Sequence, residues 1–244
     1  MLTRCLIAEN RKLHGSIIWL AFFIIPIFPA IMGTFNYMQN IDILKNGWFD
    51  LWTQHTLFYA LFFFGPIMGL YAAYLWRLEH LGHNWNMILS APVRPIYLFF
   101  AKFVVVVKMA VLTQLWVFVL FCICGRFFAQ LPGFPPVQIL FWLLRGVIGG
   151  LAIIVLELLL AMIIRSFAAP ILIALFGGVV GMGMTSQGYG LLFPYSLMLM
   201  GMNSNRTEDI ISGQLPLFLL SVILFSAIFL LLSNRFLTRH DIHT

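Results

Sequence analysis

The chain alternates long apolar runs with short polar segments. Six runs have about the 20 residues that an α-helix needs to cross the hydrocarbon core of a bilayer. They are Ile17–Tyr37, Thr53–Trp76, Tyr97–Cys124, Val137–Ile164, Ala168–Thr185 and Leu215–Leu232. Prolines inside the first two runs are compatible with spanning helices, because neighbouring helices can satisfy the carbonyls that proline leaves free. The pattern predicts an all-α membrane protein built as a bundle of six transmembrane helices.

Three segments outside these runs are predicted not to cross the membrane. Residues 1–15 are basic and partly apolar, and they predict an interfacial helix, although Glu9 interrupts the stripe formed by Leu2, Leu6 and Leu13. Residues 77–95 form a polar loop after the second span. Residues 188–213 are too apolar for a free loop and too short to span, so we expect a re-entrant or interfacial pair of half-helices before the sixth span. No linker divides the chain, and residues 1–244 read as a single transmembrane domain.

Composition supports a membrane location. Of the 244 residues, 62% are hydrophobic and 9% are charged, whereas soluble domains carry about 25% charged residues. The net charge of +6 comes from single basic residues beside apolar runs rather than from a basic patch, so we expect no nucleic-acid partner.

The basic residues predict the orientation. With the N-terminus inside, three of them fall in outer segments and nine in inner segments, which is the bias that cytoplasmic segments show. An even number of spans then places both termini in the cytoplasm. The nine inner residues are Arg4, Arg11, Lys12, Arg77, Arg94, Lys102, Arg165, Arg235 and Arg239.

The cytoplasmic segment 77–95 predicts an amphipathic helix. Its apolar residues are spaced i, i+4, i+7 and i+8, which places them on one helix face, and Pro92 then stops the helix. These apolar residues are Leu81, Trp85, Ile88 and Leu89. Such a helix either floats in the membrane interface or docks onto a soluble partner.

Two motifs suggest a family. The series Glu79…Gly82…Trp85…Ile88-Leu89…Pro92…Lys102 resembles the type-2 ABC exporter permeases, and in particular the lantibiotic-immunity permeases that give bacteria self-protection against bacteriocins. The outer stretch Phe193-Pro194-Tyr195-Ser196 is similar to the element that precedes the last span in these permeases.

This resemblance implies a function and partners. The chain would be a permease subunit in the bacterial cytoplasmic membrane that expels lantibiotic-type amphipathic peptides. It would pair with a second permease, identical or related, and with two copies of a separate ABC ATPase, which grips Glu79–Leu89 as a coupling helix. Since the sequence has no phosphate-binding loop with Gly-Lys-Ser/Thr, we expect no enzymatic activity and no cofactor in this chain, with ATP and Mg on the ATPase.

Other functions stay open. The exporter could act on a lipid or a small drug, and a non-transporting sensor subunit is a further alternative. A lipid-modifying enzyme would have to rely on Glu79, His80 and His83. We expect no metal site there, because the two histidines are three residues apart and the glutamate precedes both, unlike the zinc protease motif.

Charged residues within spans are candidates for function, because each is costly in lipid. Lys108 in the third span and Glu157 in the fourth have similar predicted depths, so we expect them to face the interior, where they would pair or line a pathway. Arg145 lies near the outer end of the fourth span and is expected to extend outward or to contact an anionic headgroup.

Small residues recur at the spacing that lets helices approach closely. Gly146 and Gly150 form one such pair in the fourth span, and Gly177 and Gly181 form another in the fifth. They predict close helix packing within the subunit or at an interface between two permeases.

Overall fold

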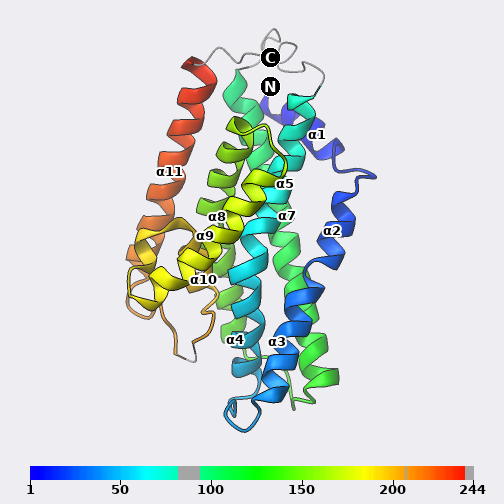
Figure 1. The fold of residues 1–244 in the computed structure, drawn as a ribbon, viewed down its shortest axis with the longest axis vertical. Coiled ribbons are helices and arrows are strands. Elements are labelled where there is room, and N and C mark those ends of the chain that lie inside the picture. The colour runs from blue at the N-terminus through cyan, green and yellow to red at the C-terminus, as the bar shows by residue number, and fades with distance from the viewer. Residues whose placement is uncertain (82–93, 207, 240–244) are drawn as a thin grey trace.

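The computed structural model describes residues 1–81, 94–206 and 208–239. All regular secondary structure in these residues is helical, and six of the helical segments are long and apolar enough to cross a membrane, as predicted. Helix α1 (Leu2–Arg11) and the last turn of α11 (Leu215–Arg239) lie at the same end of the bundle (Figure 1).

The first two spans are interrupted near their prolines. The first consists of α2 (Ile18–Ile24) and α3 (Ile27–Gln39), which are separated at Pro26 because proline cannot donate the next helical hydrogen bond. The second span runs from α4 (Trp48–Phe58) through a π-helical turn, η1 (Tyr59–Phe63), into α5 (Phe64–His80). Pro66 lies just after this turn, a place where a wider helical turn accommodates the missing donor.

The remaining spans agree with the predicted runs to within a few residues at most ends. They are α7 (Pro95–Ile123), which continues into the π-helical turn η2 (Cys124–Phe128), α8 (Val137–Ile163), α9 (Ala168–Ser186) and α11. Helix α8 is the central element, since 67% of its most apolar stretch is buried inside the protein, against 11% for α11. The exposed apolar surface of α11 is suited to contact with lipid.

The predicted re-entrant segment contains two short helices, η3 (Gly190–Leu192) and α10 (Pro194–Gly201). Every residue of α10 is buried, and α10 packs mainly against α8 and α9. In Figure 1 this yellow segment stops well short of the end of the bundle that α3 and α4 form. The chain therefore enters the bundle as a half-helix between the fifth and sixth spans and returns without crossing.

Helix α1 does not simply lie on the surface. It packs along α7, and Glu9, which seemed to interrupt its apolar face, is only 1% exposed. Leu13, just after the helix, is also buried. The amphipathic segment is thus attached to the bundle by a buried charge as well as by apolar contacts.

Candidate functional site

Four charged residues, three of them buried and Lys12 half-buried, form a cluster at the end of the bundle that carries α1. Lys102 of α7 is fully buried, and its Nζ donates hydrogen bonds to Glu9 Oε2 at 2.9 Å, to Glu79 Oε1 at 2.8 Å and to the carbonyl of Leu75 at 2.8 Å. Lys12 Nζ lies 2.6 Å from both Glu9 Oε1 and Glu79 Oε1. We call Glu9, Lys12, Glu79 and Lys102 the charge cluster.

The charge cluster balances two carboxylates with two ammonium groups. A buried ion without a partner is strongly unfavourable, so this balance is what permits its burial. Burial alone would lower the pKa of Lys12, but the attraction of Glu79 and Glu9 more than offsets it, and the pKa is raised above its ordinary value. The Lys12 charge is therefore maintained throughout the physiological pH range.

The charge cluster joins three elements that are far apart in sequence. Glu9 and Lys12 come from α1 and its end, Glu79 from the last turn of α5, and Lys102 from the second turn of α7. The ring of Trp76 on α5 lies 4.8 Å from Lys102 Nζ, which adds a cation–π contact. The neighbouring residue His80 is bonded through Nε2 to the carbonyl of Ala161 at 2.9 Å, so the end of α5 is also attached to α8.

The predicted coupling helix is only partly within the described residues. Gly82, Trp85, Ile88, Leu89 and Pro92 lie outside them. The prediction of one helix from Glu79 to Leu89 is wrong at its start, because α5 ends at His80 and Leu81 has an extended backbone.

Glu79 was predicted to dock onto the ATPase, but it is not at the surface. It is 3% exposed, because Lys12 and Lys102 provide the cations that hold it inside the bundle. Its Oε2 is buried and has no hydrogen-bond partner within the described part of the chain. Leu81 is 54% exposed, so the chain leaves the bundle between these two residues.

The expected pair of Lys108 and Glu157 does not form. Lys108 is exposed, and its Nζ donates to Oδ1 of Asn10 on α1. It lies six residues after Lys102, which turns it about 240° around the helix and away from the interior. Glu157 is fully buried, but it accepts a hydrogen bond from the hydroxyl of Tyr195 on α10 instead.

Arg145 also has a partner that the sequence did not reveal. It does not extend outward to a headgroup, because its Nη1 and Nη2 each donate to one oxygen of Asp209 at 2.9 Å. Trp142 Nε1 adds a third bond to that carboxylate at 3.3 Å. Burial would raise the pKa of Asp209, but the Arg145 guanidinium and the backbone N–H of Ile211 hold it below its ordinary value. This pair fastens α8 to the loop between α10 and α11.

The structure places all four predicted packing glycines against other parts of the same chain. A Cβ on Gly146 would overlap Met202, and one on Gly150 would lie 2.5 Å from Phe64. A Cβ on Gly177 would come within 2.6 Å of the Tyr195 ring. On Gly181 it would come within 3.0 Å of the backbone nitrogen that follows Tyr195. Three of the four thus make room for α10 or the residue after it.

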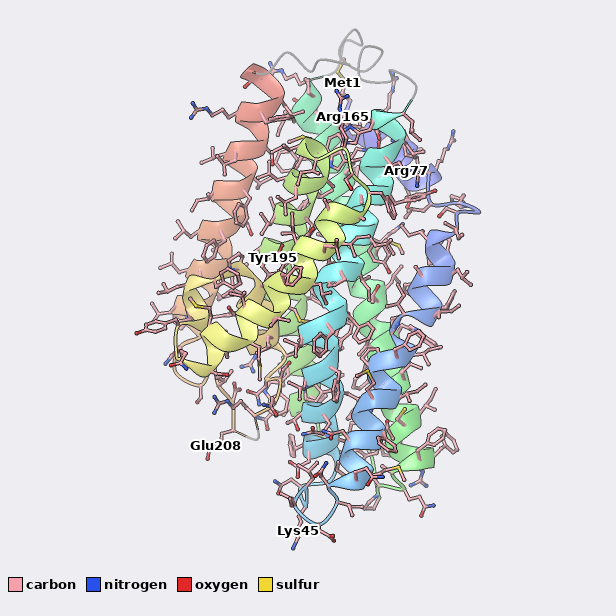
Figure 2. All side chains as sticks on the ribbon, in the orientation of Figure 1. Met1, Lys45, Arg77, Arg165, Tyr195 and Glu208 are labelled. Atoms are coloured by element: carbon pink, nitrogen blue, oxygen red, sulfur yellow. The ribbon has the colours of Figure 1, made fainter. Side chains whose placement is uncertain are left out.

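The labelled residues show how these sites are distributed along the bundle (Figure 2). Arg77 and Arg165 lie near the end that carries Met1, and Tyr195 lies about halfway down. Glu79 follows Arg77 by two residues, which places the charge cluster at the Met1 end of the bundle. The charge cluster thus lies at this end of the bundle, whereas the hydrogen bond between Tyr195 and Glu157 lies farther along it.

A comparison with protein-family models identifies a family. The family described as ABC-2 family transporter protein matches residues 5–181, nearly three quarters of the chain. The chain belongs to this ABC-2 transporter family. Searches of curated proteins and of solved structures returned no match. The family match includes the whole charge cluster, the first four spans and most of the fifth, but it ends before α10, Asp209 and α11.

Membership in the ABC-2 family defines the general role of the chain. It is a multi-pass membrane protein that serves as the permease subunit of an ABC transporter, and it associates with an ABC ATPase. Glu79 of the charge cluster is also the first residue of the stretch that the sequence predicts to contact such an ATPase.

Proposed function

We propose that this ABC-2 permease expels lantibiotic-type antimicrobial peptides from the bacterial cytoplasmic membrane. It would act with two copies of the ATPase, which bind ATP and Mg, and with a second permease that is identical or related. Residues 79–92, which we call the coupling segment, would receive the motion of the ATPase. The observation that carries the proposal is the charge cluster, which joins α1, α5 and α7 at the base of that segment.

The charge cluster suits the transmission of force. A displacement of Glu79 either moves α1 and α7 with it or breaks buried ion pairs, which costs about 3–5 kcal/mol for one partner. Movement of the attached helices is the less costly response. A push on the coupling segment would therefore shift three elements of the bundle together.

The peptide cargo is supported by the sequence resemblance and by the aromatic surface at the opposite end. Phe127, Phe128 and Phe134 are 74%, 61% and 93% exposed. Aromatic side chains at the membrane interface are well suited to amphipathic molecules, because their rings accept apolar groups beside water. An amphipathic peptide in the outer leaflet would meet this surface first.

A resistance assay tests the function. The permease is expressed with its ATPase in a sensitive bacterium, and minimal inhibitory concentrations are measured for lantibiotics, small amphipathic drugs and unrelated antibiotics. We expect higher values for lantibiotics alone, and only with an ATPase that can hydrolyse ATP. Protection against the drugs without protection against the peptides would instead identify a drug exporter.

A second experiment separates coupling from cargo recognition. Trp85→Ala should reduce copurification of the ATPase, whereas Phe141→Ala, which removes an aromatic side chain that is 62% exposed on α8, should leave it unchanged. Copurification of the ATPase with the Trp85 variant at the level of the unmodified permease would contradict the proposed contact. This measurement does not depend on which molecule is transported.

A further inference from the structure

A groove opens on the side of the bundle between α2, α5 and the start of α9. It has a volume of about 470 Å³, and its walls are mainly aliphatic. The residues that line it include Ile18, Ala21 and Ile24 on the α2 side, Leu70 on α5 and Phe167 beside α9. Since α2 and α5 belong to spanning segments, these walls are accessible to the acyl chains of the bilayer.

One cation lines this groove. Arg77 is exposed, and its guanidinium carbon lies 5.4 Å from the centre of the Phe167 ring. Among the described residues no carboxylate forms an ion pair with Arg77, in contrast to Arg145, Lys12 and Lys102. A guanidinium that stacks on a ring still has its N–H groups available at the edge for an anion.

The position of Arg77 matches the depth of a lipid headgroup. It lies near the Met1 end of the bundle (Figure 2), and Leu70 is seven residues earlier on α5, which corresponds to about 10 Å along the helix. The apolar part of the groove thus extends from the cation toward the interior of the bilayer. A phosphate at Arg77 would have room for its acyl chain below it.

We propose that this groove binds an anionic membrane phospholipid, with the phosphate at Arg77 and an acyl chain along α2. The unpaired cation favours a negative headgroup, and the aliphatic walls favour an attached chain over a free anion. The attraction between one surface arginine and an anionic lipid is about 1 kcal/mol, or about fivefold in affinity. This inference does not rest on the nature of the transported molecule.

Native mass spectrometry of the permease tests the proposal. The protein is released from nanodiscs that contain equal amounts of phosphatidylglycerol and phosphatidylcholine of the same chain length. We expect the protein to retain phosphatidylglycerol in preference to phosphatidylcholine. Arg77→Gln should reduce this preference about fivefold. Arg4→Gln, which removes an exposed cation on α1, should preserve it. Equal retention of both lipids, or an unchanged preference in the Arg77 variant, would overturn the proposal.

Three further measurements identify the occupant. Ala21→Trp places a large ring in the groove and should displace the lipid although Arg77 is intact. Glycerol phosphate should not displace the lipid at equal concentration, because it has no acyl chain, and displacement would indicate a site for free phosphate. Efficient crosslinking between two permease copies through a cysteine at Leu20 would show that a second copy covers the groove, which contradicts the lipid assignment.

Discussion

Replacing Lys102 with methionine tests the charge cluster directly. Methionine keeps most of the aliphatic stem but removes the ammonium group that contacts Glu9, Glu79 and the carbonyl of Leu75. Two carboxylates then share Lys12 as their only cation within the charge cluster. Since Lys102 is fully buried, we expect a loss of stability of about 3–5 kcal/mol, as for other buried pairs that lose one partner.

Thermal unfolding of the purified permease in detergent measures this loss. For a chain of this size, 1 kcal/mol corresponds to roughly 2–4 °C in Tm, so Tm should fall by about 6–20 °C. Lys108→Met is the matched control on the same helix, because Lys108 is exposed and its Nζ donates to Asn10 rather than to a carboxylate. That control should change the stability by no more than about 0.5 kcal/mol.

A double variant shows whether charge balance is the cause. Lys102→Met combined with Glu79→Gln leaves Glu9 and Lys12 as a neutral pair. The double variant should therefore be more stable than the sum of the single losses predicts, by at least about 1 kcal/mol. A Tm for Lys102→Met within about 2 °C of the unmodified protein, or strict additivity in the double variant, would refute the reasoning.

Three other predictions concern α10 and its surroundings. Asp209→Asn should cost about 1–2 kcal/mol at neutral pH because it breaks the bidentate pair with Arg145, and unfolding by denaturant measures the loss. Since the pKa of Asp209 is lowered in the folded state from its ordinary value of 3.8, this contribution is present above that value and is lost as the pH falls through the folded-state pKa. A difference between variant and unmodified protein that does not shrink between about pH 5 and pH 2 would contradict this. Tyr195→Phe should cost about 1–3 kcal/mol in the same assay, because Glu157 loses its hydroxyl donor. An unchanged free energy of unfolding would show that the bond contributes nothing. Gly149→Val should abolish stable folding, because even its Cβ would overlap the α10 backbone, and normal yield and Tm in detergent would show that the contact is not tight.

The spans were predictable because bilayer thickness imposes a minimum length on each apolar helix. The ends of the spans were less predictable. The second span begins at Trp48 and the sixth ends at Arg239, beyond the predicted Thr53 and Leu232. These added turns carry polar or charged residues, which hydropathy excludes from a span. At the start of the second span, tertiary contacts rather than lipid stabilise them. Asp50, for example, is 1% exposed inside the bundle.

The candidate site was only partly predictable for a related reason. The sequence predicted that Lys102 flanks a span and that Lys108 faces the interior. In the structure, Lys102 is buried and Lys108 is exposed. The difference depends on where α1 packs on α7, which no periodicity within α7 indicates. Asp209 was missed because an acid in an outer loop has no sequence signal that connects it with Arg145, 64 residues earlier.

Glu9, which interrupts the apolar face of α1, explains the arrangement at the end of the bundle that carries this helix. A purely apolar face would hold α1 at the membrane surface, but it would leave its position along the bundle undefined, because apolar contacts have little directional preference. Glu9 fixes that position through two ammonium groups, those of Lys12 and Lys102, and both of them also contact Glu79. The polar residue that weakens the amphipathic pattern thus links the N-terminal helix to the base of the coupling segment. In our proposal, α1 must therefore move with that segment whenever the ATPase displaces it.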